Sequence, residues 1–110
     1  MKTEIKTHND SPELVDKSIG SRFIGYLDAT YDDLVRLFGQ PITIEPADDA
    51  KTDVEWVIQF DTGLIATIYN YKNGPNYRGS KGTPVNEIAR WHVGGLRVRV
   101  LRKLRRMLNP

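Results

Sequence analysis

The chain has 110 residues and no cysteine. This absence excludes a disulfide framework and a thiolate metal site, and it leaves the redox compartment undefined. The sequence also has no apolar run near the ~20 residues of a membrane-spanning helix, and its first ten residues contain no apolar segment of a signal peptide. We therefore expect an intracellular, cytoplasmic protein that has no membrane partner.

Catalytic motifs are scarce as well. No GxSxG or HExxH pattern occurs, and neither histidine has neighbours at metal-ligand spacing. We interpret His92 as a surface or edge-strand residue and place His8 in an irregular terminus. The acidic pair Asp32/Asp33 suits a helix N-terminus, and the pair Asp48/Asp49 suits a solvated loop. We predict a protein that is not an enzyme and that needs no cofactor or metal.

The charge is distributed unevenly. Residues 1–95 hold ten of the sixteen Lys and Arg and all fourteen Asp and Glu, which gives this part of the chain a charge of −4. The last fourteen residues hold the other six basic residues and no acidic ones. An acidic body with a basic tail is thus the main electrostatic feature of the sequence.

A β-hairpin organises the chain. Apolar and polar residues alternate from Val54 to Phe60, the period of two expected for a half-buried strand. Asp61-Thr62-Gly63 then interrupts the run, and Gly63 can take the positive φ of a tight turn. Residues Leu64–Tyr71 resume as a β-branched and aromatic strand. A lone hairpin is not stable in water, so other elements must cover one of its faces.

The flanking segments supply candidates for those elements. Residues Arg22–Asp28 are strand-like, and Ile42–Ile44 predicts a short strand. Thr30 is positioned to cap a helix over Tyr31–Phe38, which Gly39 and Pro41 end. Further predictions are a short helix with Ser11 as N-cap and Pro12 at its first position, a strand within Val85–Val93 (best over Glu87–Val93) before a Gly94-Gly95 break, and a helix over Leu96–Leu108.

Together these elements predict an α+β fold. We expect a small antiparallel sheet of three to five strands with two or three short helices, the last of them basic and amphipathic. Residues 1–10 are predicted to be a flexible N-terminus, residues 11–95 a single domain, and residues 96–110 a basic helix packed on that domain or extending from it.

The glycine-rich segment Asn73–Thr83 has several interpretations. It is typical of a mobile loop, its cations could surround a phosphate, and nearby aromatic residues could form a contact patch for a protein. Trp91 would belong to that patch only if it were exposed. The predicted partner-binding residues are Tyr69, Tyr71, Lys72, Tyr77, Arg78 and Lys81.

The basic tail likewise leaves alternatives open. It could neutralise nucleic-acid phosphates, dock on an anionic surface or an acidic protein, or pack its apolar stripe on the sheet with its arginines in water. The candidate nucleic-acid-binding residues are Arg97, Arg99, Arg102, Lys103, Arg105 and Arg106.

Five pieces of the sequence, within about Gly25 to Gly95, resemble a family of small bacteriophage and prophage proteins. These pieces are Tyr31–Pro41 (YDDLVRLFGQP), Lys51–Asp53 (KTD), Glu55-Trp56, Ala66–Lys72 (ATIYNYK) and Trp91–Gly95 (WHVGG). The resemblance implies a phage origin, a place in the cytoplasm of the host cell and no established enzymatic role, and it assigns no functional residue.

From this resemblance and the missing catalytic groups we predict a non-catalytic, phage-encoded protein that binds and inhibits a host defence component, in the manner of an anti-CRISPR or other anti-defence inhibitor. Its partner would be a host protein, such as a defence or nucleic-acid-processing component. One alternative is a nucleic-acid-binding accessory protein that acts through the basic tail. The other is a sponge for a small anionic nucleotide held by Lys72, Arg78 and Lys81.

Overall fold

The predicted hairpin forms the middle of the sheet. A computed structural model of the chain describes residues 4–47 and 50–110. In it, β4 (Val54–Phe60) and β5 (Ile65–Tyr69) pair antiparallel, with Glu55 opposite Tyr69 and Ile58 opposite Ala66. Gly63 has a φ of +90°, as the turn requires, and its N–H donates to the carbonyl of Phe60.

Further strands extend the hairpin into a six-stranded antiparallel sheet, so the fold is α+β as predicted. The strand order is β1-β4-β5-β6-β2, and β3 also pairs with β4. The sheet has one strand more than the predicted upper limit because the N-terminal segment joins it. The remaining elements are β1 (Ile5–Thr7), α1 (Leu14–Lys17), β2 (Arg22–Asp28), α2 (Tyr31–Phe38), β3 (Ile42–Thr43), α3 (Pro75–Arg78), short 3-10 helices at Gly79–Lys81 and Val85–Glu87, β6 (Arg90–Gly95) and α4 (Arg99–Leu108).

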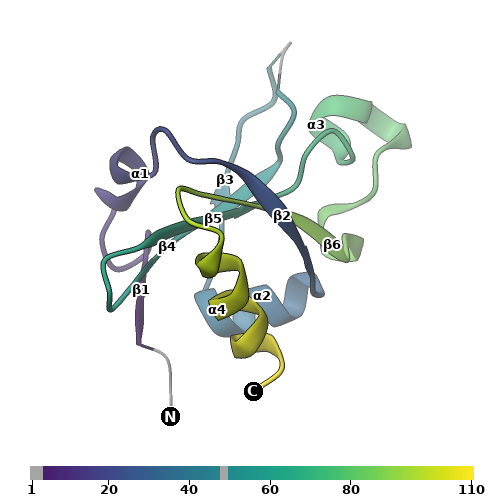
Figure 1. The fold of residues 1–110 in the computed structure, drawn as a ribbon. Coiled ribbons are helices and arrows are strands. Elements are labelled where there is room, and N and C mark those ends of the chain that lie inside the picture. The colour runs from purple at the N-terminus through teal and green to yellow at the C-terminus, as the bar shows by residue number, and fades with distance from the viewer. Residues whose placement is uncertain (1–3, 48–49) are drawn as a thin grey trace.

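One face of the sheet carries the core. Because side chains alternate along a strand, the even-numbered residues of β4 and β5 and the odd-numbered residues of β6 point to the same side. Helices α2 and α4 lie together on that side, whereas α3 lies at the far end of the sheet from them (Figure 1). The opposite face is covered near β4, where Leu14 of α1 and Val57 are both buried. In residues 4–47 and 50–110, no helix covers this face where Phe23, Tyr26 and Tyr71 are exposed.

Two tryptophans form the centre of the core. Trp56 and Trp91 are fully buried, and their rings meet edge to face with centroids 5.4 Å apart. Each indole N–H has a backbone acceptor: Trp56 Nε1 donates to Gly39 O at 2.8 Å and Trp91 Nε1 donates to Ala29 O at 3.0 Å. Trp91 therefore takes no part in an exposed aromatic patch.

Helix α2 begins where the sequence predicted. The Thr30 hydroxyl accepts a hydrogen bond from the Asp33 N–H at 3.0 Å, and Asp33 Oδ2 accepts one from the Thr30 N–H at 3.4 Å. This reciprocal pair is a capping box. Hydrogen bonds from Arg36 and then from Thr30 hold the pKa of Asp33 below its usual range. Asp33 therefore caps the helix and pairs with Arg36 at 2.8 Å.

Residues 4–10 contain regular structure, contrary to the expectation for residues 1–10, of which residues 1–3 lie outside the described residues. Its β1 pairs with β4, with Ile5 opposite Phe60 and Thr7 opposite Ile58. His8 is buried, where its Nε2 donates to Gln40 O at 2.9 Å and its Nδ1 accepts from the Val57 N–H at 3.3 Å. Both ring nitrogens are thus used in joining this segment to β4 and to the end of α2.

Several predicted boundaries were wrong. The first helix, α1, begins after Glu13 and not at Pro12, and Ser11 does not cap it. Strand β6 begins at Arg90 and includes Gly94-Gly95, which were expected to end it, while Val85–Glu87 form a 3-10 helix. The last helix begins at Arg99, three residues later than predicted.

Candidate functional site: an aromatic face on the open side of the sheet

The open side of the sheet carries a cluster of five rings. Four are aromatic side chains and the fifth is a histidine, and they come from β2, the end of β5 and β6. We call this cluster the aromatic face; its members are Phe23, Tyr26, Tyr69, Tyr71 and His92. Phe23, Tyr26 and Tyr71 are 47%, 45% and 38% exposed, so the described part of the chain leaves much of the cluster uncovered.

His92 lies at the centre of the cluster. Its ring centroid is 5.1 Å from that of Phe23, 5.0 Å from Tyr26, 5.5 Å from Tyr69 and 5.4 Å from Tyr71. Strand register explains this position, because Tyr69 and Tyr26 are the cross-strand partners of His92 on either side. The five rings therefore form one continuous surface.

The environment of His92 favours its neutral form. Burial lowers the pKa of its imidazole, since a charged ring would lose hydration among the surrounding rings. Its Nδ1 is buried and has no hydrogen-bond partner within residues 4–47 and 50–110. A buried polar atom without a partner reduces stability. His92 thus contributes to a ring surface at some cost in folding free energy.

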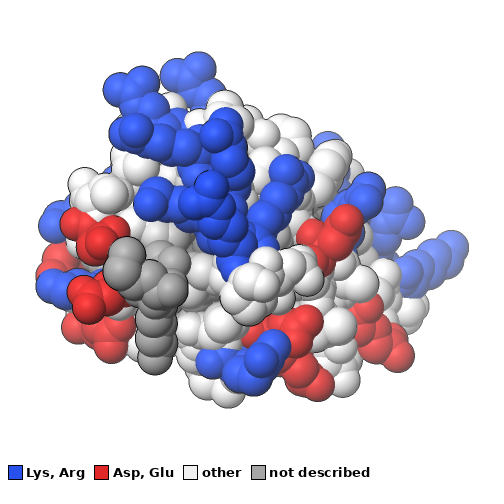
Figure 2. All heavy atoms as spheres, turned by 60° about the horizontal axis from the view of Figure 1, so that its bottom comes forward, with Lys and Arg blue, Asp and Glu red and all other residues white. Residues whose placement is uncertain are grey.

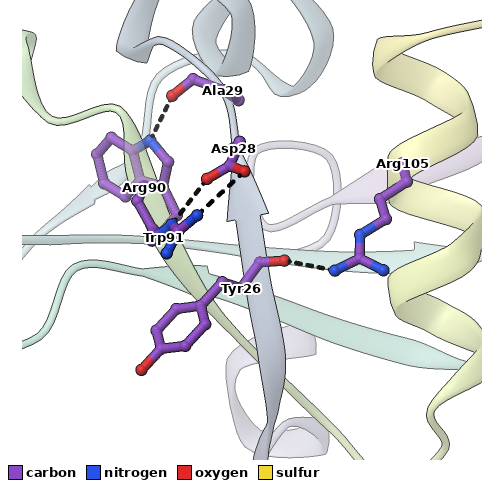
Figure 3. Close-up of polar contacts among 6 residues, drawn as sticks. All are labelled: Tyr26, Asp28, Ala29, Arg90, Trp91 and Arg105. Atoms are coloured by element: carbon purple, nitrogen blue, oxygen red, sulfur yellow. Dashed lines mark hydrogen bonds and ion pairs between the residues drawn. The ribbon is translucent and has the colours of Figure 1, made fainter.

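Two cations border the aromatic face. Lys72 Nζ lies 5.4 Å from the ring centroid of Tyr71 and 5.7 Å from that of Tyr77. At the opposite border, Arg90 Cζ lies 5.4 Å from the centroid of Tyr26, and Arg90 Nε donates to Asp28 Oδ1 at 2.8 Å (Figure 3). The hydrogen bond from Arg90 holds the pKa of Asp28 below its usual range.

A buried polar network fixes the glycine-rich segment beside this face. Asn70 is fully buried: its Oδ1 accepts from the N–H groups of Asp53 (2.8 Å) and Val54 (3.1 Å), and its Nδ2 donates to Asp53 Oδ1 at 2.8 Å and to Asn73 Oδ1 at 3.1 Å. Asp53 Oδ2 in turn accepts from the backbone N–H of Asn76 at 3.0 Å. The start of α3 is therefore tied to the β4–β5 hairpin.

This network corrects the prediction of a loop without regular structure over Asn73–Thr83. The segment contains α3 and a 3-10 helix. The side chain of Asn76 donates to Ile44 O at 2.9 Å and to Thr52 O at 3.0 Å, and the Thr83 N–H donates to Asn73 O at 2.7 Å. Side-chain to backbone hydrogen bonds of this kind define one conformation, which composition alone did not indicate.

The structure brings together most of the predicted partner-binding residues. Tyr69 and Tyr71 lie in the aromatic face, Lys72 joins Tyr71 to Tyr77, and Arg78 Nε donates to Lys72 O at 3.0 Å. Lys81 is exposed in the next 3-10 helix, and within the described residues its side chain forms no hydrogen bond or ion pair with this group.

Sequence reasoning missed the other half of the aromatic face. His92 was interpreted as a surface or edge-strand residue without a functional role, and Phe23 and Tyr26 were assigned only to a strand. The available signal was the density of rings in two segments, RFIGYLD and RWHVGG. This signal alone did not indicate a cluster. The cluster depends on the antiparallel register that places Tyr26 opposite His92, and that register has an irregularity between Phe23 and Gly25.

A hollow of about 340 Å³ adjoins the aromatic face. It lies between the connection from α1 to β2 and the segment before β4, and Glu55, Thr67, Tyr69 and Tyr71 contribute to its wall. Burial raises the pKa of Glu55, and burial followed by the charge of Glu55 raises that of Tyr69. Its lining does not include Lys72, Arg78 or Lys81, so these cations do not converge on it as the nucleotide-sponge interpretation would require.

The six basic residues proposed for nucleic-acid binding lie elsewhere. Arg97 precedes α4 and the other five belong to it, and α4 covers the core side of the sheet, away from the aromatic face. Figure 2 shows Lys and Arg side chains gathered in one area on the side of the molecule that carries α4, with acidic side chains around that area and not at its centre.

Other candidates from the sequence do not form a site. In residues 4–47 and 50–110, no three His, Asp or Glu side chains are placed to hold a metal ion together. The pair Asp48/Asp49 lies outside the described residues. None of the helices in the described ranges is long and apolar enough to cross a membrane.

Comparisons of this chain with protein-family models, with curated proteins and with solved structures found no match.

Proposed function

We propose that this chain is a non-catalytic binding protein that engages another protein through the aromatic face. The observation that carries the proposal is the cluster of five contacting rings on the part of the sheet side that α1 leaves uncovered, with Phe23, Tyr26 and Tyr71 more than one third exposed. Tyrosine and other large rings dominate the binding energy of protein interfaces because they bury much area at a small entropy cost.

The border of the face suits a protein partner too. Protein interfaces surround an apolar centre with polar and charged groups that remain hydrated at the rim. Here Lys72, Tyr77 and Arg78 lie along one border, and the Arg90–Asp28 pair lies along another. The Asn70 network supports this arrangement, since it fixes the segment that holds Tyr77 before any partner arrives and so lowers the ordering cost of binding.

The resemblance to bacteriophage and prophage proteins guides the choice of partner. We propose that the partner is a host protein, namely a defence or nucleic-acid-processing component in the cytoplasm, and that the bound chain inhibits it. The aromatic face supports binding in general, and the resemblance alone supports this class of target.

The experiment compares two variants with similar expected stability. In Tyr26→Ala/Tyr71→Ala, two exposed rings of the aromatic face are removed. In the control Val15→Ala/Ile19→Ala, two apolar side chains that are also exposed, but lie at α1, are removed. Each protein carries a tag, is checked for a folded spectrum by circular dichroism, and is used to capture partners from a nuclease-treated bacterial lysate.

We expect the wild type and the control to retain the same protein, and the tyrosine variant to lose it. Hot-spot side chains typically contribute at least ~2 kcal/mol each, so the loss of both tyrosines should weaken binding by about 4 kcal/mol, or roughly 700-fold. In infected cells that carry a defence system, plating efficiency should rise with the wild type and the control only. Equal capture by both variants would refute the aromatic face as the binding surface, and no effect on plating would refute the defence target.

A further inference from the structure

We propose that the outer row of α4, composed of Arg99, Arg102 and Arg106, binds the phosphate backbone of nucleic acid without reading its sequence. This surface is separate from the aromatic face, because α4 packs on the core side of the sheet.

Packing fixes which side of α4 faces outward. Val100, Leu101 and Leu104 are buried, and Met107 and Leu108 are partly buried against the same core. These five positions form one stripe of the helix, and every other position of α4 is Arg or Lys. At 100° per residue, the row Arg99–Arg102–Arg106 lies directly opposite the buried stripe. The row therefore projects into solvent from the most exposed side of the helix.

Two of the five basic side chains have structural contacts. Arg105 Nη2 donates to the carbonyl oxygen of Tyr26 at 3.1 Å, with the Tyr26 ring on the other side of β2 (Figure 3). Lys103 Nζ lies 5.6 Å from the ring centroid of Phe60. These contacts hold α4 on the sheet. No ion pair involves Arg99, Arg102 or Arg106 within the described ranges, so these three guanidinium groups are available to a partner.

Helix stability does not explain the row. Cations near a helix C-terminus are favourable, which accounts for Arg105 and Arg106. Arg99 and Arg102, however, lie in the first turn, where the helix dipole disfavours positive charge. Arg102 and Arg106 are also four residues apart, a like-charge spacing that opposes helix formation by about 0.2–0.5 kcal/mol. The row weakens the helix, so a binding role explains it better than a structural one.

The geometry suits a phosphate backbone. Seven steps of 1.5 Å along the helix separate Arg99 from Arg106, so the row is about 10 Å long. One strand of duplex DNA carries a charge every ~3.4 Å along its axis, so the row can lie beside about three phosphates. Arginine is well matched to phosphate because its planar guanidinium can donate two hydrogen bonds at once. Residues 1–95, with their net charge of −4, leave the attraction concentrated at α4.

The test measures binding of the full chain to fluorescent oligonucleotides as a function of salt. The probes are a 20-base-pair DNA duplex, a single-stranded DNA and an RNA of the same length. For three neutralised phosphates, the affinity should fall about 40-fold for the duplex, and about 20-fold for a single strand, between 50 and 200 mM NaCl.

Two variants with the same change in net charge distinguish the effect of the arginine row from the effect of net charge. Arg99→Gln/Arg102→Gln/Arg106→Gln and the control Lys6→Gln/Lys17→Gln/Lys51→Gln each lower the net charge by three, and the control residues are exposed and distant from α4 in the chain. We expect the arginine variant to lose binding and most of its salt dependence, and the lysine variant to retain both. Arg99→Lys/Arg102→Lys/Arg106→Lys should keep most of the salt dependence, since charge is preserved.

Three outcomes would overturn the proposal. They are no binding to any of the three oligonucleotides, an equal loss of binding in both glutamine variants, and binding of the wild type to anionic phosphatidylserine vesicles without binding to oligonucleotides. The last outcome would identify a membrane surface as the partner. All of them are independent of protein capture by the aromatic face, which the α4 variants leave intact.

Discussion

Asn70 offers the sharpest test of the structure, because one buried side chain joins the hairpin to the glycine-rich segment. Its amide makes four hydrogen bonds, three of them with Asp53 and Val54. In Asn70→Ala, two buried N–H groups and one carboxylate oxygen lose their partner. Each buried group left unsatisfied costs about 1–3 kcal/mol. Taking the low end for all three groups, since water can enter the polar space, the free energy of unfolding should fall by about 3 kcal/mol.

The assay is urea denaturation followed by circular dichroism and tryptophan fluorescence. Trp56 and Trp91 are both fully buried, so fluorescence reports on loss of the core. With a denaturant dependence of about 1–3 kcal/mol per M, the midpoint should fall by roughly 1–3 M. Asn86→Ala is the control, since Asn86 is exposed and its loss should change the stability by at most about 0.5 kcal/mol.

A second substitution tests the same network by pH. Asn70→Asp keeps an acceptor for the Asp53 and Val54 N–H groups, but it places an oxygen where Nδ2 now donates to Asp53 Oδ1 at 2.8 Å. Two adjacent buried carboxyls cannot both ionise easily, so one takes a raised pKa in the folded state. The folded variant then binds more protons than the unfolded chain, and its stability should rise as the pH falls from 7 toward 5. Asn70→Ala should show no such gain. A midpoint for Asn70→Ala equal to that of Asn86→Ala would refute the network.

Three further predictions test side-chain contacts and burial elsewhere in the fold. Trp91→Phe removes the donor to Ala29 O and part of a buried ring, and should lower the free energy of unfolding by about 2 kcal/mol and the melting temperature by roughly 10 °C; an unchanged melting temperature would contradict the buried position. Thr30→Ala removes the hydroxyl that caps α2 at the Asp33 N–H and should cost about 1 kcal/mol by urea denaturation, whereas Thr30→Ser should restore most of it. Glu55→Gln should stabilise the protein at pH 7, because burial raises the pKa of Glu55 and so opposes its charged form. This gain in stability should shrink as the pH falls through that raised pKa. An equal gain at pH 7 and pH 4 would contradict the raised pKa of Glu55.

Local patterns predicted the parts of the fold that depend on neighbours in the chain. The alternation in Val54–Phe60, the turn at Gly63 and the capping residue Thr30 are each local signals, and the structure confirms all three elements. The end of β6 was wrong because a Gly-Gly pair is typical of a turn. In the sheet, a Cβ atom on Gly94 would lie 2.5 Å from Thr67 Oγ1, so glycine is needed there for close packing between strands.

Long-range pairing explains what the sequence did not predict. Strand β1 meets β4 across about fifty residues, and nothing in the polar N-terminal segment marked it as a strand. The aromatic face has the same origin, since Tyr26 and His92 are sixty-six positions apart and meet only through the β2–β6 register. The tyrosines near the glycine-rich segment were found because they are close in sequence. A pattern in a short stretch of sequence can reveal only the part of a surface whose residues lie close together in the chain.

Buried contacts in the structure join several of the sequence pieces Tyr31–Pro41, Lys51–Asp53, Glu55-Trp56 and Ala66–Lys72. Trp56 donates to the carbonyl of Gly39, which joins two of the pieces, and Asp53 and Asn70 join two others. Trp56, Asp53 and Asn70 are buried and connect separate elements of the fold. The proposed binding groups differ in this respect, since Tyr26 and the outer arginines of α4 are exposed. Substitutions of those exposed groups should leave the buried contacts intact, so a loss of binding in such variants reports on recognition and not on unfolding.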